Sequence, residues 1–333
     1  MLRTPLCRQL GIEYPIFSVG MGPAAGPELA AAVSNAGGCG VLGGGGAPAP
    51  YLRQEIQRLR TLTDKPFGVN LLLPLLQEGQ IETCLDEKIP ILVLFWGDPR
   101  PYVNEAHRRG TKVFIQVGSV EEAQRAAEAG VDAIIAQGVE AGGHVKSTTA
   151  LSTIVPAVVE AVTPVPVIAA GGIATGRGVV AALSLGAQAV SMGTRFLCSV
   201  EGRANRDYKE RIVKSKAEDT VYTVLFDIGW PDAAHRVLRN RAFQEWETAG
   251  RPASGQHPGE GTIVGTFSVA GTSMETPKYS AMAPLTGFVG DMEYVALYAG
   301  ESCNFVNDIK PAAQIVQDVA REAEEVLEQM KRL

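Results

Sequence analysis

The chain of 333 residues is 46% hydrophobic and 20% charged, a composition typical of a soluble globular protein. Its net charge of −6 at pH 7 argues against a nucleic acid or an anionic membrane surface as the main partner. No apolar run approaches the roughly 20 residues that span a bilayer, and the five scattered cysteines form no C-x-x-C pair. We therefore expect a cytoplasmic protein without a metal site. Glycine is in excess, with 37 residues, which predicts many positions of positive φ or close ligand approach.

Eight short apolar runs, rich in β-branched residues, recur through the first 200 residues. Most are continuous rather than alternating, which is typical of parallel strands buried on both faces. Helical segments lie between them: one begins at Pro27 and ends at Asn35, and another follows Ser119, with Glu122 placed for a capping box. The runs cover residues 15–17, 40–42, 67–71, 91–94, 112–116, 133–136, 165–169 and 189–192.

The number and spacing of these units predict the fold. Eight strand–helix units favour a closed (β/α)8 TIM barrel of the α/β class, with an open doubly wound sheet as the alternative. From about residue 205 the pattern becomes irregular and includes a segment rich in proline and glycine. We predict a barrel from residues 1–204 and 291–333, with a smaller, mostly helical insert over the barrel mouth from residues 205–290. An amphipathic helix within 311–333 would complete the barrel.

Glycines follow the last two predicted strands, where the active site of such a barrel lies. Gly171-Gly172 leads into a helix, and Gly193-Thr194 follows the next strand. Loops at these two positions form phosphate sites in barrels, because bare backbone N–H groups point at the anion. These loops contain no lysine, so the backbone would carry most of the binding. Arg195 either assists the anion or pairs with a carboxylate, and tight turns alone are the alternative explanation for the glycines.

Polar side chains follow other strands at the same rim. Asn70, Gln116 and Gln137 could hydrogen-bond the edge of a heteroaromatic ring, although each alone could be an ordinary buried amide. His144 follows two glycines at a strand end, and its titration range suits proton transfer near neutrality. We predict that His144 is the catalytic acid or base, with a structural histidine as the alternative. Glu140 either orients His144, shapes its loop or lies at the surface.

Three motifs, Glu140–His144, Ala169–Ile173 and Met192–Phe196, resemble those of the nitronate monooxygenases, once called 2-nitropropane dioxygenases. The segments Tyr14–Met21 and Lys65–Asn70 fit the same family. The resemblance covers about the first 200 residues, with the motifs in the expected order. It implies a TIM barrel that holds FMN without a covalent bond and carries a helical insert over its mouth.

The resemblance also implies roles for residues at this rim. His144 would be the catalytic group beside the flavin, and Met21 would pack against the flavin ring. Asn70 and Gln116 would lie near the ring, whereas the glycine loops and Thr194 would hold the phosphate. The predicted cofactor-binding residues are Met21, Gly22, Asn70, Gln116, Gln137, Gly142, Gly143, Ala170, Gly171, Gly172, Gly193 and Thr194.

The family chemistry implies a function. An anionic nitronate reduces the flavin and O2 then yields a carbonyl compound and nitrite, while the histidine removes the α-proton of a neutral nitroalkane. We therefore expect an FMN-dependent oxidoreductase, most simply a nitronate monooxygenase. The expected partners are a small-molecule substrate and O2, and we expect neither nucleic acid nor a membrane. The sequence leaves open whether the protein forms a homodimer.

Three alternative functions remain. Two belong to the same superfamily, NAD(P)H:quinone reduction and FMN-dependent enoyl-acyl carrier protein reduction, and both would use NAD(P)H as reductant. The third is a non-catalytic barrel that binds a phosphate ligand. Two departures from the family pattern bear on the substrate: Ser18 stands where glutamine is frequent, and Val145-Lys146 stands where glycine is usual. Lys146 either attracts an anionic substrate or faces solvent.

Overall fold

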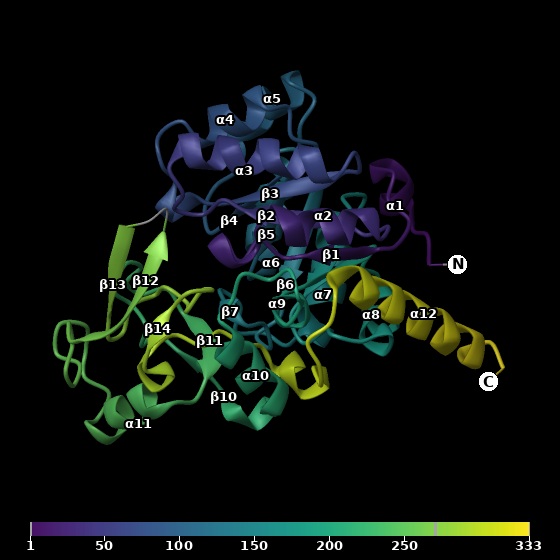
Figure 1. The fold of residues 1–333 in the computed structure, drawn as a ribbon. Coiled ribbons are helices and arrows are strands. Elements are labelled where there is room, and N and C mark those ends of the chain that lie inside the picture. Colours follow the sequence, from purple (N-terminus) through teal and green to yellow (C-terminus); the bar gives the residue numbers. More distant parts are fainter. Residues whose placement is uncertain (1, 270–271, 333) are drawn as a thin grey trace.

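Eight parallel strands form the barrel at the centre of the molecule (Figure 1). The computed structural model describes residues 2–269 and 272–332. The sheet runs in the order β1-β9-β8-β6-β5-β4-β3-β2, and a parallel bridge between Phe17 and Cys39 joins its two ends. The TIM barrel prediction is therefore confirmed. The strands are β1 (Ile16–Ser18), β2 (Gly40–Gly43), β3 (Phe67–Leu72), β4 (Ile91–Phe95), β5 (Lys112–Val117), β6 (Ala133–Gln137), β8 (Val167–Ala170) and β9 (Ala189–Met192).

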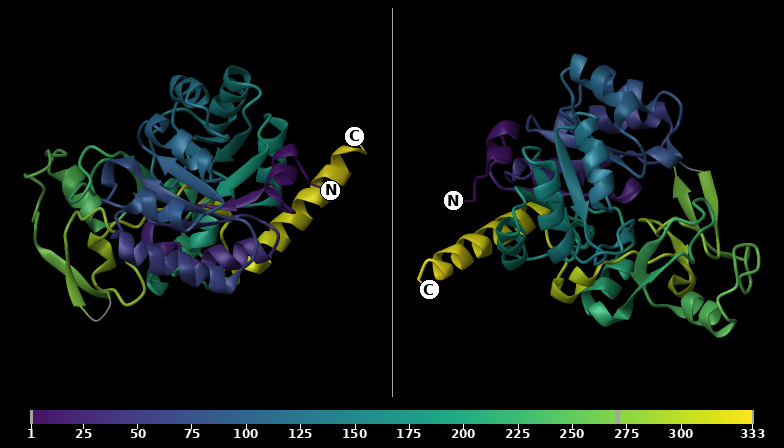
Figure 2. Two further views of the ribbon diagram at one scale, coloured as in Figure 1. Left: turned by 90° about the horizontal axis from the view of Figure 1, so that it is seen from above. Right: turned by 180° about the vertical axis from the view of Figure 1, so that it is seen from behind.

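Helices surround the barrel, as the views in Figure 2 show. Helix α2 spans the predicted residues, and the Ser119 hydroxyl caps α6 by accepting a hydrogen bond from the Glu122 N–H at 3.2 Å. The last helix, α12, packs against α8 and α2 and completes the ring. The helices are α1 (Pro5–Leu10), α2 (Pro27–Asn35), α3 (Ala49–Leu62), α4 (Gln80–Asp86), α5 (Arg100–Arg108), α6 (Val120–Glu128), α7 (Leu151–Val162), α8 (Gly176–Ser184), α9 (Thr194–Leu197) and α12 (Ala312–Met330), with single 3-10 turns at Gly22–Ala24, Leu73–Leu75, Met292–Tyr294 and Glu301–Phe305.

Continuous apolar strands give the barrel two buried layers. One layer fills the barrel interior, where the Phe17 and Phe114 rings lie 6.2 Å apart. The other layer lies between the strands and the surrounding helices. Because both faces of each strand are covered, the runs show no polar alternation, and burial of this apolar surface is the main force that holds the barrel together.

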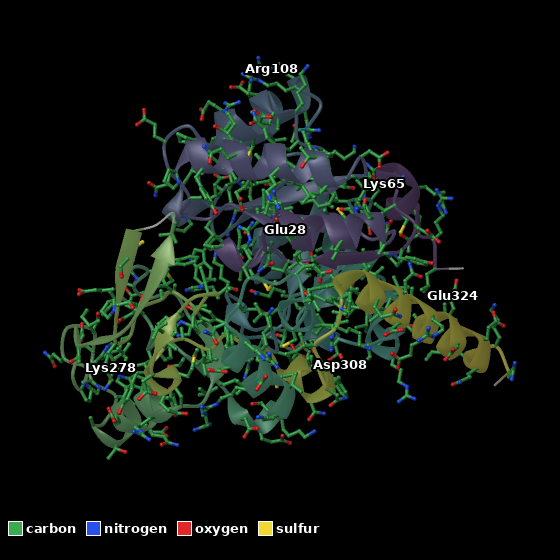
Figure 3. The ribbon with its side chains drawn as sticks, in the orientation of Figure 1. Glu28, Lys65, Arg108, Lys278, Asp308 and Glu324 are labelled. Atoms are coloured by element: carbon green, nitrogen blue, oxygen red, sulfur yellow. The ribbon has the colours of Figure 1, made fainter. Side chains whose placement is uncertain are left out.

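Residues 205–290 contain more strand than helix, so the expectation of a mostly helical insert is wrong. Its strands form two small antiparallel sheets. One is ordered β10-β11-β7 and takes its third strand, β7 (Gly143–His144), from the segment after β6, and the other is ordered β13-β12-β14. Lys278, labelled in Figure 3, lies in this part of the molecule, where its Nζ is 2.6 Å from Glu245 Oε2. The elements are α10 (Arg206–Lys214), a 3-10 turn (Ala217–Asp219), β10 (Thr220–Thr223), β11 (His235–Leu238), α11 (Arg241–Thr248), β12 (Ile263–Val269), β13 (Thr272–Pro277) and β14 (Val289–Gly290).

The insert joins the barrel through a short strand that carries the predicted base. Strand β7 (Gly143–His144) follows β6 and pairs antiparallel with β11, so that His144 lies opposite His235 and Gly143 lies opposite Arg236. The Arg236 guanidinium also donates to the Val139 carbonyl oxygen at 2.9 Å. These bonds fix the insert against the loop that follows β6, at the carboxyl end of the barrel strands.

Candidate active site

Two groups of backbone contacts hold His144 at the rim. On one side β11 pairs with it. On the other side the Gln137 side chain donates from Nε2 to the His144 carbonyl at 3.0 Å, and its Oε1 accepts from the Lys146 N–H at 3.1 Å. Gln137 is buried, and both ends of its amide are engaged by this segment. The structure thus gives Gln137 a task that the sequence did not suggest, which is to hold the histidine segment in place.

An aromatic enclosure surrounds the His144 ring. Trp230 stacks on it with a centroid separation of 4.1 Å and an interplanar angle of 27°. The rings of Tyr298 and His235 lie 5.5 and 5.6 Å away, and Trp96 lies edge-on at 6.4 Å. Among the described residues, nothing hydrogen-bonds the buried Nε2 of His144. A buried polar atom without a partner is rare in proteins and indicates a place where a missing group binds.

Burial decides the charge of His144. Loss of solvent, with a smaller contribution from His235, lowers the pKa of His144 from 6.5 to about 3. The ring is therefore neutral at physiological pH, and a neutral imidazole nitrogen can accept a proton. The orphaned Nε2 atom is placed to do so.

His235 is buried beside His144 but cannot share its role. Its Nδ1 lies 2.8 Å from the Ala233 carbonyl oxygen, and its Nε2 accepts from the Phe226 N–H at 3.3 Å. Burial lowers the pKa of His235 to about 4. This ring is neutral and both of its nitrogens are engaged, so His144 is the one of the pair with a free nitrogen.

The glycine loops after β8 and β9 leave backbone donors free. In the described part of the chain, the N–H groups of Gly171, Gly172 and Gly193 donate to no other protein group. Gly171 and Gly172 have φ of +106° and +69°, which other residues rarely adopt. A Cβ on Gly171 would come within 3.1 Å of the Ala141 backbone nitrogen. Free donors in loops whose positions 171 and 172 favour glycine fit the phosphate of a cofactor.

The start of helix α8 contributes less than the sequence suggested. The Thr175 hydroxyl accepts from the Gly178 N–H at 3.2 Å, and the Gly176 N–H donates to Glu322 Oε2 at 2.7 Å. These side chains of the protein already satisfy the helix terminus. The Thr194 hydroxyl accepts from the Gly300 N–H at 3.0 Å, which leaves its own O–H able to donate. The donors that remain for a phosphate therefore include those of the glycine loops and the Thr194 hydroxyl.

The other predicted cofactor residues also lie at strand ends of the rim. Asn70 is buried and donates to the Val93 carbonyl at 3.1 Å. Met21 is half-buried between the barrel core and a cluster of apolar residues from the insert and the 295–306 segment. Gln116 borders a cavity of about 180 Å³. The remaining members of the set are Gly22 with φ of +52°, Gly142, Gly143 with φ of +75°, and Ala170, whose carbonyl accepts from the Gly138 N–H.

Three charged residues near the rim have protein partners. Lys146 forms an ion pair with Glu122 and lies over the Trp96 ring at 5.7 Å. Arg195 pairs with the Asp308 carboxylate at 2.9 Å, so of its two predicted roles the structure displays the ion pair. Both Glu140 carboxylate oxygens accept from the N–H of Leu151, the first residue of α7. Glu140 therefore shapes the loop before His144.

Sequence reasoning missed most of the aromatic enclosure. Trp96 directly follows β4, so the strand-end rule that found Asn70 could have found it. Its φ of +64° is unusual for a bulky residue, and such backbone conformations concentrate at functional sites. Trp230 and Tyr298 reach His144 only through the fold of the insert and the segment after it, and no local pattern marks them.

The described residues contain no group of three or more His, Cys, Asp or Glu side chains that could hold a metal ion. None of the helices in this part of the chain is long and apolar enough to cross a membrane.

Comparison with known proteins identifies a matching family model and two similar proteins. The family model described as nitronate monooxygenase matches residues 3–80 and 75–322. A probable nitronate monooxygenase of Staphylococcus aureus is 30% identical over 369 residues, covering 97% of this chain and 98% of the relative. A Mycobacterium tuberculosis protein named (3aS,4S,5R,7aS)-5-hydroxy-7a-methyl-1-oxo-octahydro-1H-indene-4-carboxyl-CoA dehydrogenase is 37% identical over 253 residues, covering 75% of this chain and 70% of the relative.

Two solved structures are similar over nearly the whole chain. FabK from Thermotoga maritima has a TM-score of 0.81 at 35% identity, with 99% of both chains covered. A nitroalkane oxidase from Streptomyces ansochromogenes has a TM-score of 0.79 at 29% identity, covering 98% of this chain and 99% of the other. Barrel and insert are therefore shared with both structures.

Proposed function

Since this chain belongs to the nitronate monooxygenase family of flavin oxidoreductases, we propose that it uses FMN to oxidise alkyl nitronates with O2 to carbonyl compounds and nitrite. The observation that carries the proposal is the buried, unpartnered Nε2 of His144 beside loops that fit a phosphate. We also propose a cytoplasmic location, because all five cysteines are free and buried, as in a protein of a reducing compartment.

The glycine loops would hold the cofactor. The N–H groups of Gly171, Gly172 and Gly193 would donate to the FMN phosphate, and Asn70 and Gln116 would lie toward the flavin ring. Bound FMN supplies a two-electron acceptor that O2 can reoxidise. With Arg195 and Lys146 engaged by carboxylates, the phosphate charge would be met mainly by oriented backbone dipoles.

His144 would act on the substrate. Its Nε2 takes the α-proton from a neutral nitroalkane, and the electron pair of the broken C–H bond stays on the substrate as a nitronate. A preformed nitronate needs no such transfer, so its oxidation should depend less on the histidine. The aromatic rings around His144 exclude water from the site, and Gln137 holds the histidine backbone in position.

A second candidate is FMN-dependent reduction of an enoyl thioester with NAD(P)H. The similarity to FabK over 99% of both chains favours it, as does the relative named as a CoA dehydrogenase. The same histidine would then protonate the substrate rather than deprotonate it. Quinone reduction by NAD(P)H would also use the flavin, but no particular contact in the structure favours it.

Anaerobic reduction of the flavin tests the proposal and separates the candidates. FMN-loaded protein is mixed separately with ethyl nitronate, NADH and NADPH, and the loss of flavin absorbance is followed by stopped flow. We expect rapid bleaching by the nitronate and slow bleaching by either nicotinamide. Rapid bleaching by NADH or NADPH alone would replace nitronate oxidation with one of the reductase functions. A protein that binds no FMN would contradict all three.

A further inference from the structure

The insert places one aromatic ring directly on the face of His144. Of the rings around it, Trp230 is the one in a stacked arrangement, at 4.1 Å and 27°. Trp96 meets His144 edge-on, and the Trp96 and Trp230 rings meet each other at 5.2 Å and 65°. Trp230 is 7% exposed, so the stack lies away from bulk water. The geometry places the electron-rich indole face against the imidazole.

The segment that carries Trp230 is held by backbone hydrogen bonds just before the tryptophan. The Trp230 N–H donates to the Asp227 carbonyl at 3.0 Å. Next to it, the Ile228 N–H donates to the Tyr279 carbonyl at 3.1 Å, and the Ile228 carbonyl accepts from the Ala281 N–H at 2.9 Å. The imidazole is carried by β7, which pairs with β11 of the same insert. Indole and imidazole are therefore positioned by one connected unit.

A base in this position becomes a cation where the described residues supply no unpaired carboxylate, so its anionic partner is the nitronate that the same step forms. Each charged neighbour is already engaged: Lys146 with Glu122, Arg236 with the Val139 carbonyl and Glu301, and Glu140 with the start of α7. The two titratable rings nearest to His144 carry no charge at neutral pH. His235 has both nitrogens engaged, and the Tyr298 hydroxyl donates to the Ala281 carbonyl at 2.7 Å.

Burial, with a smaller contribution from His235, makes His144 a weak base, since together they lower its pKa to about 3. A general base works best when its pKa lies near the working pH. A group that stabilises the imidazolium without placing a further charge beside the substrate would offset part of this lowering. A tryptophan face within about 6 Å of a desolvated cation does so, and its effect on an equilibrium is roughly ten- to thirtyfold.

We propose that Trp230 is a positioning residue for the base, whose indole face stabilises the imidazolium that forms when His144 takes a proton from the substrate. The inference rests on the proposed function, in which His144 is the general base. It also assigns a task to the insert, which would supply one wall of the active site as well as a cover for the barrel mouth.

The test compares two substitutions of one side chain on two substrates. Trp230→Phe keeps an aromatic face, whereas Trp230→Leu keeps bulk without one. Trp246→Phe serves as the control, because Trp246 lies on α11 of the same insert and has its own hydrogen bond to the Pro252 carbonyl. The holoenzymes are compared by kcat/KM for nitroethane and for preformed ethyl nitronate, each as a function of pH.

For Trp230→Leu we expect kcat/KM for nitroethane to fall about tenfold and kcat/KM for ethyl nitronate to change little. The pKa of the base in the pH profile should fall by about one unit, since one unit corresponds to tenfold. Trp230→Phe should retain most of the activity, and Trp246→Phe should leave the profile in place. Equal losses on the two substrates, equal effects of Leu and Phe, or an unmoved profile would each overturn the inference and leave Trp230 a packing residue.

Failure of the proposed function would be recognised separately. If the FMN-loaded wild type oxidises neither substrate, the proposed function fails, and the inference is then judged by NMR titration of the His144 ring in the holoenzyme. A lower titration midpoint in Trp230→Leu than in wild type supports the stabilising stack. Identical titration in the two proteins refutes it.

Discussion

Gly142 is the position where a single methyl group should disturb the active site most directly. A Cβ built on this residue would lie 2.5 Å from the Ala299 carbonyl carbon and closer still to the Gly300 backbone nitrogen. Both neighbours are backbone, which cannot rotate away as a side chain could. Substitution by alanine must therefore push apart the His144 loop and the segment at residues 299–300.

The expected loss of stability follows from two opposing effects. Alanine reduces the freedom of the unfolded chain, which favours folding by about 0.4–1 kcal/mol. Forcing a methyl group into a closed contact costs about 1–3 kcal/mol, and a backbone neighbour places this site toward the upper end. We expect Gly142→Ala to lower the free energy of unfolding by about 2 kcal/mol. The same displacement reaches His144, where a misplacement of about 1 Å can reduce turnover by roughly a hundredfold.

Gly193→Ala provides the control for the unfolding measurement alone, because Gly193 itself belongs to the proposed cofactor site. Its φ of −95° suits any residue, and the nearest atom to an added Cβ is Val19 Cγ2 at 3.9 Å. Urea unfolding of both flavin-free variants gives the loss of stability, and nitronate turnover of Gly142→Ala and wild type at saturating FMN gives the loss of activity. A Gly142→Ala protein as stable and as active as the wild type would refute the reasoning, because the two segments could then separate at no cost.

Two further predictions concern the phosphate loop and an ion pair beside it. Gly193→Ala should keep the unfolding free energy of the flavin-free protein, because the added methyl group meets no protein atom closer than 3.9 Å. It should weaken FMN binding, measured by fluorescence titration, about tenfold, because the methyl group would crowd the phosphate beside the loop. Unchanged affinity would remove Gly193 from the site. At Asp308, burial raises the pKa, but contacts with Lys310 and Arg195 outweigh it and hold the pKa below its ordinary 3.8. A lowered carboxyl pKa contributes stability above pH 3.8 that is lost as the pH falls further. Asp308→Asn should therefore lower the free energy of unfolding by about 1 kcal/mol at pH 7, and the difference from wild type should shrink below pH 3.8. A difference that is constant with pH would contradict this assignment.

Local patterns predicted the barrel because each of its strands is covered on both faces. The continuous apolar runs and the proline at the start of α2 needed no knowledge of distant residues. The insert was misjudged although Thr220–Thr223 and Ile263–Val269 are rich in β-branched residues and now form β10 and β12. Each is a short strand without a helix after it. The alternation of strands and helices that predicted the barrel therefore did not indicate how these strands pair.

The site was predicted to the extent that strand ends define it. His144 and the glycine loops follow strands directly, and the barrel topology brings them to one rim. Gln137 shows where this reasoning stops, because the partners of its amide depend on how the next loop turns back. Trp230 lies 86 residues beyond His144 in the chain. Their stacking depends on the pairing of β7 with β11 and on the backbone hydrogen bonds of Ile228 to residues 279 and 281.

Replacement of His144 tests the central claim most directly. FMN-loaded wild type and His144→Ala are compared by kcat/KM on nitroethane and on preformed ethyl nitronate. Loss of a general base costs about 10²–10⁴-fold in rate, so we expect a loss of that size on nitroethane and a much smaller one on the nitronate. Equal losses on the two substrates, or none on nitroethane, would contradict the assignment of His144 as the base.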